Sequence, residues 1–205
     1  GTGALVWEQS LLPAGGPQVG GDVATPALRN GVLWIPFWHD GLGPCAGGLA
    51  RLDAATGSIL GTDATGAGSS PVVTTGAIVA STEGGCGAGA QLVVRDLTTR
   101  EVLWTHRFPA GSGVATPTIA GGRLFVLTGG TLYAFAADGC GADVCAPLWS
   151  EPGAGSTVFD FLRPAAGPGG TLVTVGASSG PGTAATIVVR DAATGMGVRT
   201  SVDLV

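Results

Sequence analysis

The sequence contains no lysine, and charged residues account for only 11% of its 205 positions. Its nine basic residues are all arginines that stand apart from one another, so it lacks the basic run that neutralises nucleic-acid phosphates. No apolar stretch approaches the roughly 18 residues that a membrane-spanning helix needs. No stretch of about ten residues places its apolar side chains at the 3.6-residue period of a helix. These absences argue against a nucleic acid as partner, against a membrane span and against a helical fold.

Glycine and short apolar runs are what the sequence has in abundance. It contains 38 glycines and 13 prolines, and 45% of its residues are hydrophobic. Val, Leu and Ile recur in short bursts bounded by Gly, Pro, Thr and Asp, which is typical of many short strands joined by tight turns. A chain of this length can bury one sizeable core. We therefore expect an all-β domain.

A repeat of about 46 residues runs through the chain. Its units are anchored by Pro26, Pro71, Pro117 and Pro164, which are 45, 46 and 47 residues apart. In each unit a strand follows the proline, glycine turns connect it to two more strands, and an Asp-x-x-Thr-Gly type of turn leads to an outer strand. Four antiparallel strands per unit at this period are typical of a β-propeller blade. A parallel β-helix has shorter coils and is the less favoured alternative.

Two motifs of the repeat resemble a known family. The first is Thr-Pro-Thr-Ile-Ala-Gly-Gly-Arg-Leu-Phe-Val at 116–126, followed by Leu-Tyr-Ala-Phe at 132–135. The second is Leu-x-x-x-Asp-x-x-Thr-Gly-x-x-x-Trp, seen in varying degrees around Asp53, Asp96 and Asp191. Both resemble the PQQ-like (quinoprotein-type) propeller repeat. The resemblance covers nearly the whole chain and implies a propeller fold.

The resemblance also implies that a tryptophan of each outer strand packs between adjacent blades. Trp7, Trp104 and Trp149 match this blade-docking position. Gly61 and Arg199 stand where the tryptophan would be in the other two units. Burying a ring of this size contributes on the order of 2–3 kcal/mol. The two junctions that lack it are therefore candidate weak seams.

The chain is expected to be one β-propeller domain, 1–205, with about four blades and one additional outer strand. The blades are expected at about 21–63, 66–107, 112–152 and 158–203, and residues 3–9 are expected to form the outer strand of a preceding or closing blade. Since propellers of this family have about seven or eight blades, we expect a partial ring of a larger propeller. Pairing of half-propellers and a closed four-bladed ring are the alternatives. Open strand edges and apolar blade faces favour self-association.

The four cysteines are predicted to form two disulfides. One is Cys140–Cys145 within a single loop, and the other is Cys45–Cys86 between glycine-rich loops of two successive units. A metal site is the alternative, but the spacing is not that of a zinc ribbon and no histidine lies close to either pair. Disulfides persist in oxidising compartments. We therefore expect a secreted, extracellular or cell-surface protein.

The resemblance does not extend to catalytic residues. Quinoprotein dehydrogenases of this family carry an adjacent Cys–Cys disulfide and a Ca²⁺ site of acidic and amide oxygens. This chain has no adjacent cysteines, and its only asparagine, Asn30, lies in a turn. We assign no catalytic, cofactor-binding or metal-ligating residue and expect no cofactor. Asp53, Asp96 and Asp191 are interpreted as turn caps.

One aromatic segment is the best candidate for contact with a ligand or partner. It comprises Trp34, Phe37, Trp38, His39 and Asp40, and it interrupts the usual hairpin of its unit. Aromatic rings beside a histidine and an aspartate are suited to a sugar or a peptide. The alternative is a loop that caps the blade face, with Trp38 as a hydrophobic plug.

Together these observations favour a non-catalytic extracytoplasmic propeller that acts as a binding or scaffold module. Protein partners or other copies of the chain are the expected contacts. Two further hypotheses stay open: part of a PQQ-dependent dehydrogenase whose active site lies in other blades, and a structural building block of an extracellular assembly.

Overall fold

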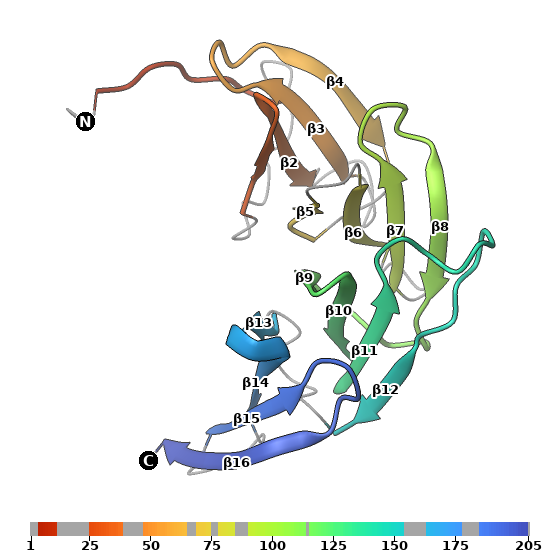
Figure 1. Ribbon diagram of the computed structural model, residues 1–205. Helices are drawn as coiled ribbons and strands as arrows, with labels where there is room; N and C mark the ends of the chain where they lie inside the picture. The colour runs from red at the N-terminus through yellow and green to blue at the C-terminus, as the bar shows by residue number, and fades with distance from the viewer. Residues whose placement is uncertain are drawn as a thin grey trace.

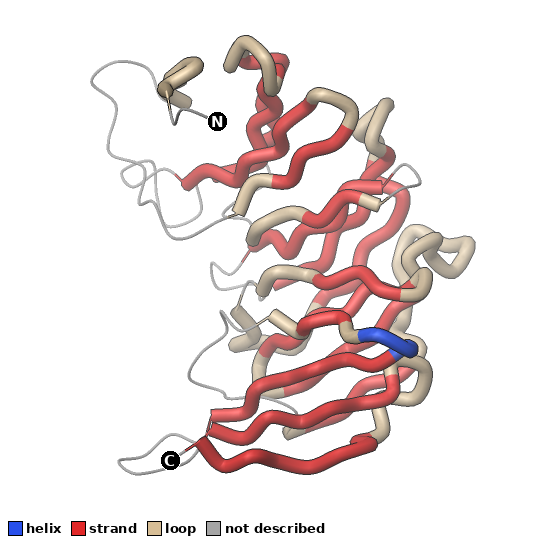
Figure 2. The backbone as a smooth tube through the Cα atoms, turned by 60° about the vertical axis from the view of Figure 1, so that its left-hand side comes forward, coloured by secondary structure: helices blue, strands red, loops and turns tan. Residues whose placement is uncertain are grey.

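The computed structural model describes residues 4–11, 25–38, 47–64, 69–74, 78–84, 90–113, 115–153, 163–177 and 185–204. These residues form four separate four-stranded antiparallel sheets, which follow one another along the chain. The sheets stand side by side in an open arc, and the two ends of the chain lie at opposite ends of it (Figure 1 and Figure 2). We call the sheets blades 1 to 4 in chain order.

Each blade begins with a strand of two or three residues and ends with a longer outer strand. Blade 1 contains β1 (Ala27–Arg29), β2 (Val32–Trp38), β3 (Gly47–Asp53) and β4 (Ile59–Ala64). Blade 2 contains β5 (Val72–Val73), β6 (Ile78–Gly84), β7 (Ala90–Asp96) and β8 (Val102–Arg107). Blade 3 contains β9 (Thr118–Ala120), β10 (Arg123–Thr128), β11 (Thr131–Ala136) and β12 (Trp149–Pro152). Blade 4 contains β13 (Ala165–Ala166), the 3-10 turn η1 (Pro168–Gly170), β14 (Thr171–Ala177), β15 (Ala185–Asp191) and β16 (Gly197–Leu204).

This architecture confirms the prediction of an all-β partial propeller. Each of the four anchoring prolines immediately precedes the first strand of its blade, a position that suits proline because it has no N–H to give to a strand ladder. The first strands face the hollow of the arc, and β4, β8, β12 and β16 form its convex rim (Figure 1). Within the described ranges, no helix has the length and apolar character to cross a bilayer.

The turn between the third and fourth strands is built by an aspartate in three blades. Asp53 Oδ1 accepts hydrogen bonds from the backbone N–H groups of Ala55 and Thr56, at 3.0 and 2.8 Å. Asp96 and Asp191 accept the equivalent pairs in blades 2 and 4. In blade 3, Ala136 occupies the position of the aspartate. The turn there is one residue shorter than in the other blades, because Gly139 N–H donates to the Ala136 carbonyl. The aspartates therefore act locally, as turn caps.

The core lies between the blades, so the middle strands are apolar on both faces. In β10, Leu124 and Val126 pack with blade 2 residues such as Trp104, whereas Phe125 and Leu127 pack with Leu172 of blade 4. This alternation follows from the two-residue period of a strand. Blades 2 and 3 are thus packed against a neighbour on both sides, and blades 1 and 4 on one.

Candidate functional site

Two tryptophans pack against glycines of the following blade. The Trp104 ring of blade 2 lies on Gly139 of blade 3, and Trp149 of blade 3 lies on Gly195 of blade 4. A Cβ added to Gly139 would lie 2.7 Å from Trp104 Cδ1, and one added to Gly195 would lie 2.7 Å from Trp149 Cε3. Both glycines also have a positive φ, +84° and +76°, where L side chains are disfavoured. Glycine is therefore required for two reasons at each docking point.

Trp7 makes the same contact with blade 1. Its ring lies on Gly57, where an added Cβ would come within 2.6 Å of Trp7 Cε3, and its Nε1–H donates to the Ala54 carbonyl at 3.0 Å. The segment around it, residues 4–11, forms no strand. Its assignment as the outer strand of another blade stays a prediction.

The register of the strands identifies the residues that replace tryptophan elsewhere. Trp104 and Trp149 each face a small aliphatic residue on the neighbouring strand, and the strand register gives the equivalent pair of positions in all four blades. The pairs are Arg51–Gly61, Val94–Trp104, Ala134–Trp149 and Val189–Arg199. Gly61 and Arg199 thus occupy the docking position, and in blade 1 the cross-strand partner has changed as well.

The junction between blades 1 and 2 has lost both halves of the docking contact. Gly61 replaces the tryptophan, and Arg100 replaces the glycine of the facing turn while keeping its positive φ, +69°. Arg100 Nη1 instead lies 3.8 Å from Asp63 Oδ1 on β4. The loss of tryptophan at Gly61 was predicted from the sequence, but the loss of glycine at Arg100 was not. The sequence did contain a sign of this change, because Arg100 occupies the position of the glycine in the Asp-x-x-Thr-Gly pattern.

The Arg51 side chain lies in the same junction. Its Nη2 is the atom nearest to the space that a Cβ on Gly61 would take, and its guanidinium carbon lies 5.7 Å from the centre of the Trp34 ring. A guanidinium at this distance from an indole face makes a cation–π contact. An arginine and a buried indole therefore replace the docked tryptophan of the other junctions.

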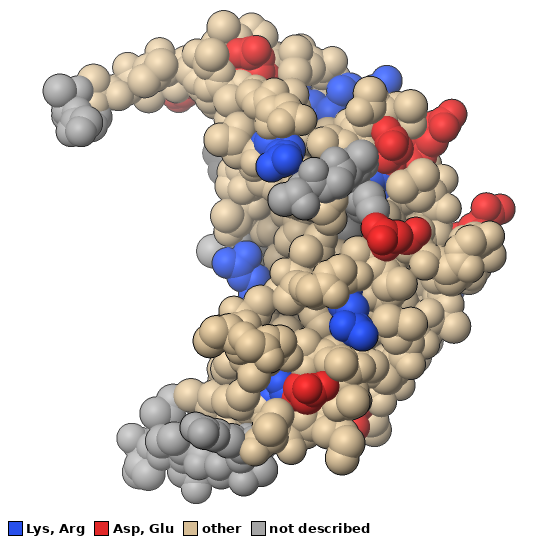
Figure 3. Space-filling view, viewed as in Figure 1, with Lys and Arg blue, Asp and Glu red and all other residues tan. Residues whose placement is uncertain are grey.

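A pocket of about 140 Å³ opens at this junction. Its walls come from the first three strands of blade 1 and from the turn after β7 in blade 2. The lining residues are Arg29, Asn30, Val32, Trp34, Arg51, Leu97 and Thr98. Two of them are cationic and none is acidic. The charged side chains on the face in Figure 3 are otherwise scattered and gather into no large patch of one sign.

The predicted aromatic segment is described only in part. Trp34 is 2% exposed and packs with Leu49, and Phe37 is half-buried on β2. Trp38 ends that strand. His39 and Asp40 lie outside the described residues, so the contact role of the whole segment stays a prediction.

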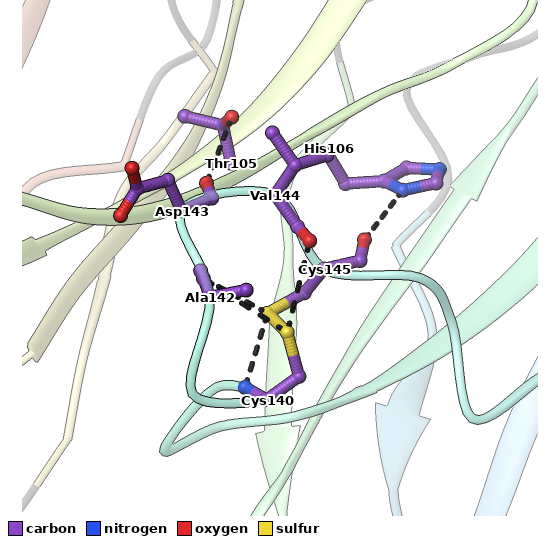
Figure 4. The surroundings of a disulfide bond; sticks show 7 residues. All are labelled: Thr105, His106, Cys140, Ala142, Asp143, Val144 and Cys145. Atoms are coloured by element: carbon purple, nitrogen blue, oxygen red, sulfur yellow. Dashed lines mark hydrogen bonds between the residues drawn. A yellow bond between two sulfur atoms is a disulfide. The ribbon is translucent and has the colours of Figure 1, made fainter.

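The predicted Cys140–Cys145 disulfide is confirmed, with 5.7 Å between the two Cα atoms. Its loop crosses from blade 3 to β8 of blade 2 (Figure 4), where Thr105 N–H donates to the Asp143 carbonyl at 2.8 Å. His106 Nδ1 lies 2.8 Å from the Cys145 carbonyl, which can only accept, so this nitrogen donates. The disulfide loop therefore ties blades 2 and 3 together. The predicted partners Cys45 and Cys86 lie outside the described residues.

The His106 ring completes an aromatic cluster at this second junction. Its centre lies 4.8 Å from that of Phe135 and 5.1 Å from that of Phe108. With its Nδ1 engaged and its ring packed, His106 has a structural role. No group of three metal-ligating side chains occurs in the described part of the chain.

The convex rim carries an exposed aliphatic residue just before each docking position. These residues are between 43% and 83% exposed. They are Val6, Leu60, Leu103, Leu148 and Val198. Ile59 and Val102 extend the set on β4 and β8. We call the whole set the rim row.

An arc of four-stranded blades joined by docked tryptophans defines a β-propeller. A family model described as "Outer membrane protein assembly factor BamB" matches residues 46–198. The match covers more than half of the sequence, and the chain belongs to this family of PQQ-like propellers. The resemblance seen in the sequence is thereby confirmed. No curated protein matches the chain.

Solved propellers share the fold at low sequence identity. BamB from Moraxella catarrhalis is 13% identical with a TM-score of 0.55, over 88% of this chain and 64% of that one. Hydrazine synthase from Kuenenia stuttgartiensis is 17% identical with a TM-score of 0.61, over 89% and 51%. A chain of the mitotic checkpoint complex is 14% identical with a TM-score of 0.59, over 93% and 52%. This chain thus spans less than two thirds of each.

Proposed function

We propose that this chain is part of an extracytoplasmic β-propeller that acts as a non-catalytic binding or scaffold module for other proteins. The family description, which names a protein-assembly factor, supports a protein as partner. The Cys140–Cys145 disulfide supports an oxidising compartment. The proposal rests chiefly on the rim row.

The rim row has the properties of a contact surface. Its aliphatic side chains recur one residue before each docking position: Leu60, Leu103 and Val198 lie on outer strands, and Leu148 directly precedes one. The outer strands are also the last strands of their sheets, a position from which a strand can pair with another chain, although the disulfide loop already pairs with β8 at Thr105. Exposed aliphatic side chains along the outer strands suit association with a protein better than binding of a small polar substrate.

Site-specific photo-crosslinking in cells that express the protein would test this proposal. We expect a photo-reactive residue at Leu60 or Leu103 to give discrete protein adducts. The same residue at Arg163, which is exposed beside the inner strand β13, should give none. Equal labelling from all three positions, or none from the rim, would contradict the proposal.

Two other functions have distinct signatures. A PQQ-dependent enzyme should take up the quinone with Ca²⁺ and oxidise an alcohol, and stoichiometric quinone binding by the protein would exclude a purely non-catalytic role. Pairing of half-propellers, or a structural assembly, should appear in sedimentation as a discrete larger species. Leu60→Asp with Leu103→Asp should dissociate that species if the rim row makes the contact.

A further inference from the structure

We propose that the pocket between blades 1 and 2 binds a carboxylate carried on a short apolar stem. The occupant we infer is an acidic side chain of a polypeptide partner, and only this source of the carboxylate rests on the proposed function. The site itself stands on the residues that line the pocket and can be tested without a partner.

The charge of the lining selects an anion. Arg51 lines the pocket beside Arg29, and none of the described lining residues is Asp or Glu, although the whole chain has a formal net charge of −5. Arginine is suited to planar carboxylates because its guanidinium presents parallel N–H donors. The pocket is thus positive within a protein that is otherwise acidic.

Two buried donors in the lining have no acceptor in the described part of the chain. They are the Nε of Arg51 and the Nε1 of Trp34. Trp34 is 2% exposed, and buried N–H groups in folded proteins are nearly always hydrogen-bonded. Both groups can only donate. A ligand that supplies acceptor oxygens would satisfy them.

The remaining walls favour a carboxylate on an apolar stem over a phosphate. Val32, Leu97 and the Trp34 ring provide apolar surface, which suits methylene groups and would not replace the hydration of a phosphate dianion. The volume of about 140 Å³ corresponds to roughly five water molecules at 30 Å³ each. A glutamate side chain fits within this volume.

The junction between blades 3 and 4 contains a docking tryptophan, whereas the junction with the pocket does not. There Trp149 lies 5.9 Å from Phe125, measured between ring centres, and Ala134 stands where blade 1 has Arg51. That junction is filled by aromatic and aliphatic groups. Replacement of the tryptophan by Gly61 and of the small aliphatic by Arg51 removes that filling and introduces a cation.

NMR titration of the tryptophan indoles provides a direct test. The chain has five tryptophans, so its ¹H–¹⁵N spectrum should contain five indole signals, and Trp34→Phe identifies the one from Trp34. We expect butyrate and the peptide acetyl-Gly-Glu-Gly-amide to shift the Trp34 signal with a dissociation constant on the order of 1 mM. Uncharged butyramide should leave it unchanged.

Variants then locate the binding. Arg51→Gln should weaken butyrate binding at least about tenfold, whereas Arg163→Gln, which removes the same charge from an exposed residue of blade 4, should not. Leu97→Phe fills the pocket from blade 2, keeps Arg51 and should also abolish binding, so a folding defect of one variant cannot explain both results. No shift of Trp34 with butyrate, an equal shift with butyramide, or stronger binding of propyl phosphate would overturn the site. A shift with butyrate but not with the peptide would overturn the polypeptide source.

Discussion

Arg100 of blade 2 reaches back to Asp63 of blade 1, with 3.8 Å between Nη1 and Oδ1, across the junction that lacks a docked tryptophan. The two side chains are 45% and 19% exposed, so solvent screens the pair and it contributes less than about 1 kcal/mol. A buried tryptophan contributes roughly 2–3 kcal/mol. We therefore expect the junction between blades 1 and 2 to be the weaker one.

The backbone conformation of Arg100 predicts that a glycine variant is more stable than an alanine variant at this position. Its φ of +69° is the conformation of Gly57 and Gly195 in the equivalent turns, and a Cβ in this region costs on the order of 1–2 kcal/mol. We expect Arg100→Gly to be more stable than Arg100→Ala by about 1 kcal/mol, because both lose the ion pair and only glycine relieves the backbone. Urea unfolding of the two variants measures the difference. An alanine variant as stable as the glycine variant would contradict this account.

The docking contact can be separated from the backbone effect within blade 4. Gly195 and Gly170 have nearly the same φ, +76° and +75°, but an added Cβ would meet Trp149 only at Gly195. We expect Gly170→Ala to lose about 1 kcal/mol and Gly195→Ala to lose about 1–3 kcal/mol more, because the alanine methyl overpacks the ring contact. Denaturant midpoints give both values. Equal losses of unfolding free energy in the two variants would mean that the Trp149 ring moves aside without destabilising the protein, and would contradict the prediction.

The Cys140–Cys145 disulfide should stabilise the protein by restricting its unfolded chain. For cysteines five positions apart, the chain-entropy relation gives about 2 kcal/mol. We expect Cys140→Ala with Cys145→Ala to lower the unfolding free energy by about this amount. Mass analysis after alkylation without reductant provides the check, since neither cysteine of the native protein should be labelled. A free thiol at Cys140 would refute the pairing.

Acid should weaken the three aspartate turns. The backbone N–H of Thr56 is the main cause that holds the pKa of Asp53 below its ordinary value, and the backbone N–H groups of Thr99 and Thr194 do the same for Asp96 and Asp191. A pKa that is lower in the folded state gives stability that is present above the unfolded pKa of 3.8 and is lost as the pH falls through the folded value.

We therefore expect the unfolding midpoint to fall as the pH is lowered below about 4. Asp191→Asn should reduce this dependence because the amide does not titrate, while its oxygen can still accept the turn hydrogen bonds. Asp143→Asn, which removes a charge from an exposed loop, serves as the control. An acid slope that is the same in Asp191→Asn and in the parent would contradict the assignment.

Much of the fold could be predicted from short-range patterns. The prolines mark the start of each blade because each of them immediately precedes the first strand. The Asp-x-x-Thr-Gly turns could be read because an aspartate two or three residues before an N–H group caps it locally. The Cys140–Cys145 pair was accessible for the same reason, since the two residues share a loop. The reach of that loop to His106, 39 residues away, was not predictable.

The features of a single blade follow from the amino-acid sequence: its period, its turns, its apolar strands and the positions of its tryptophans. These features depend on contacts within a few residues, and each repeat carries them independently. The contents of each junction become visible only in the folded protein. The ion pair of Arg100 with Asp63, and the meeting of Trp34 and Arg51 with Leu97, join side chains from different blades. The physical reason is that a junction forms between faces far apart in sequence, so its residues become complementary only when the blades stand side by side.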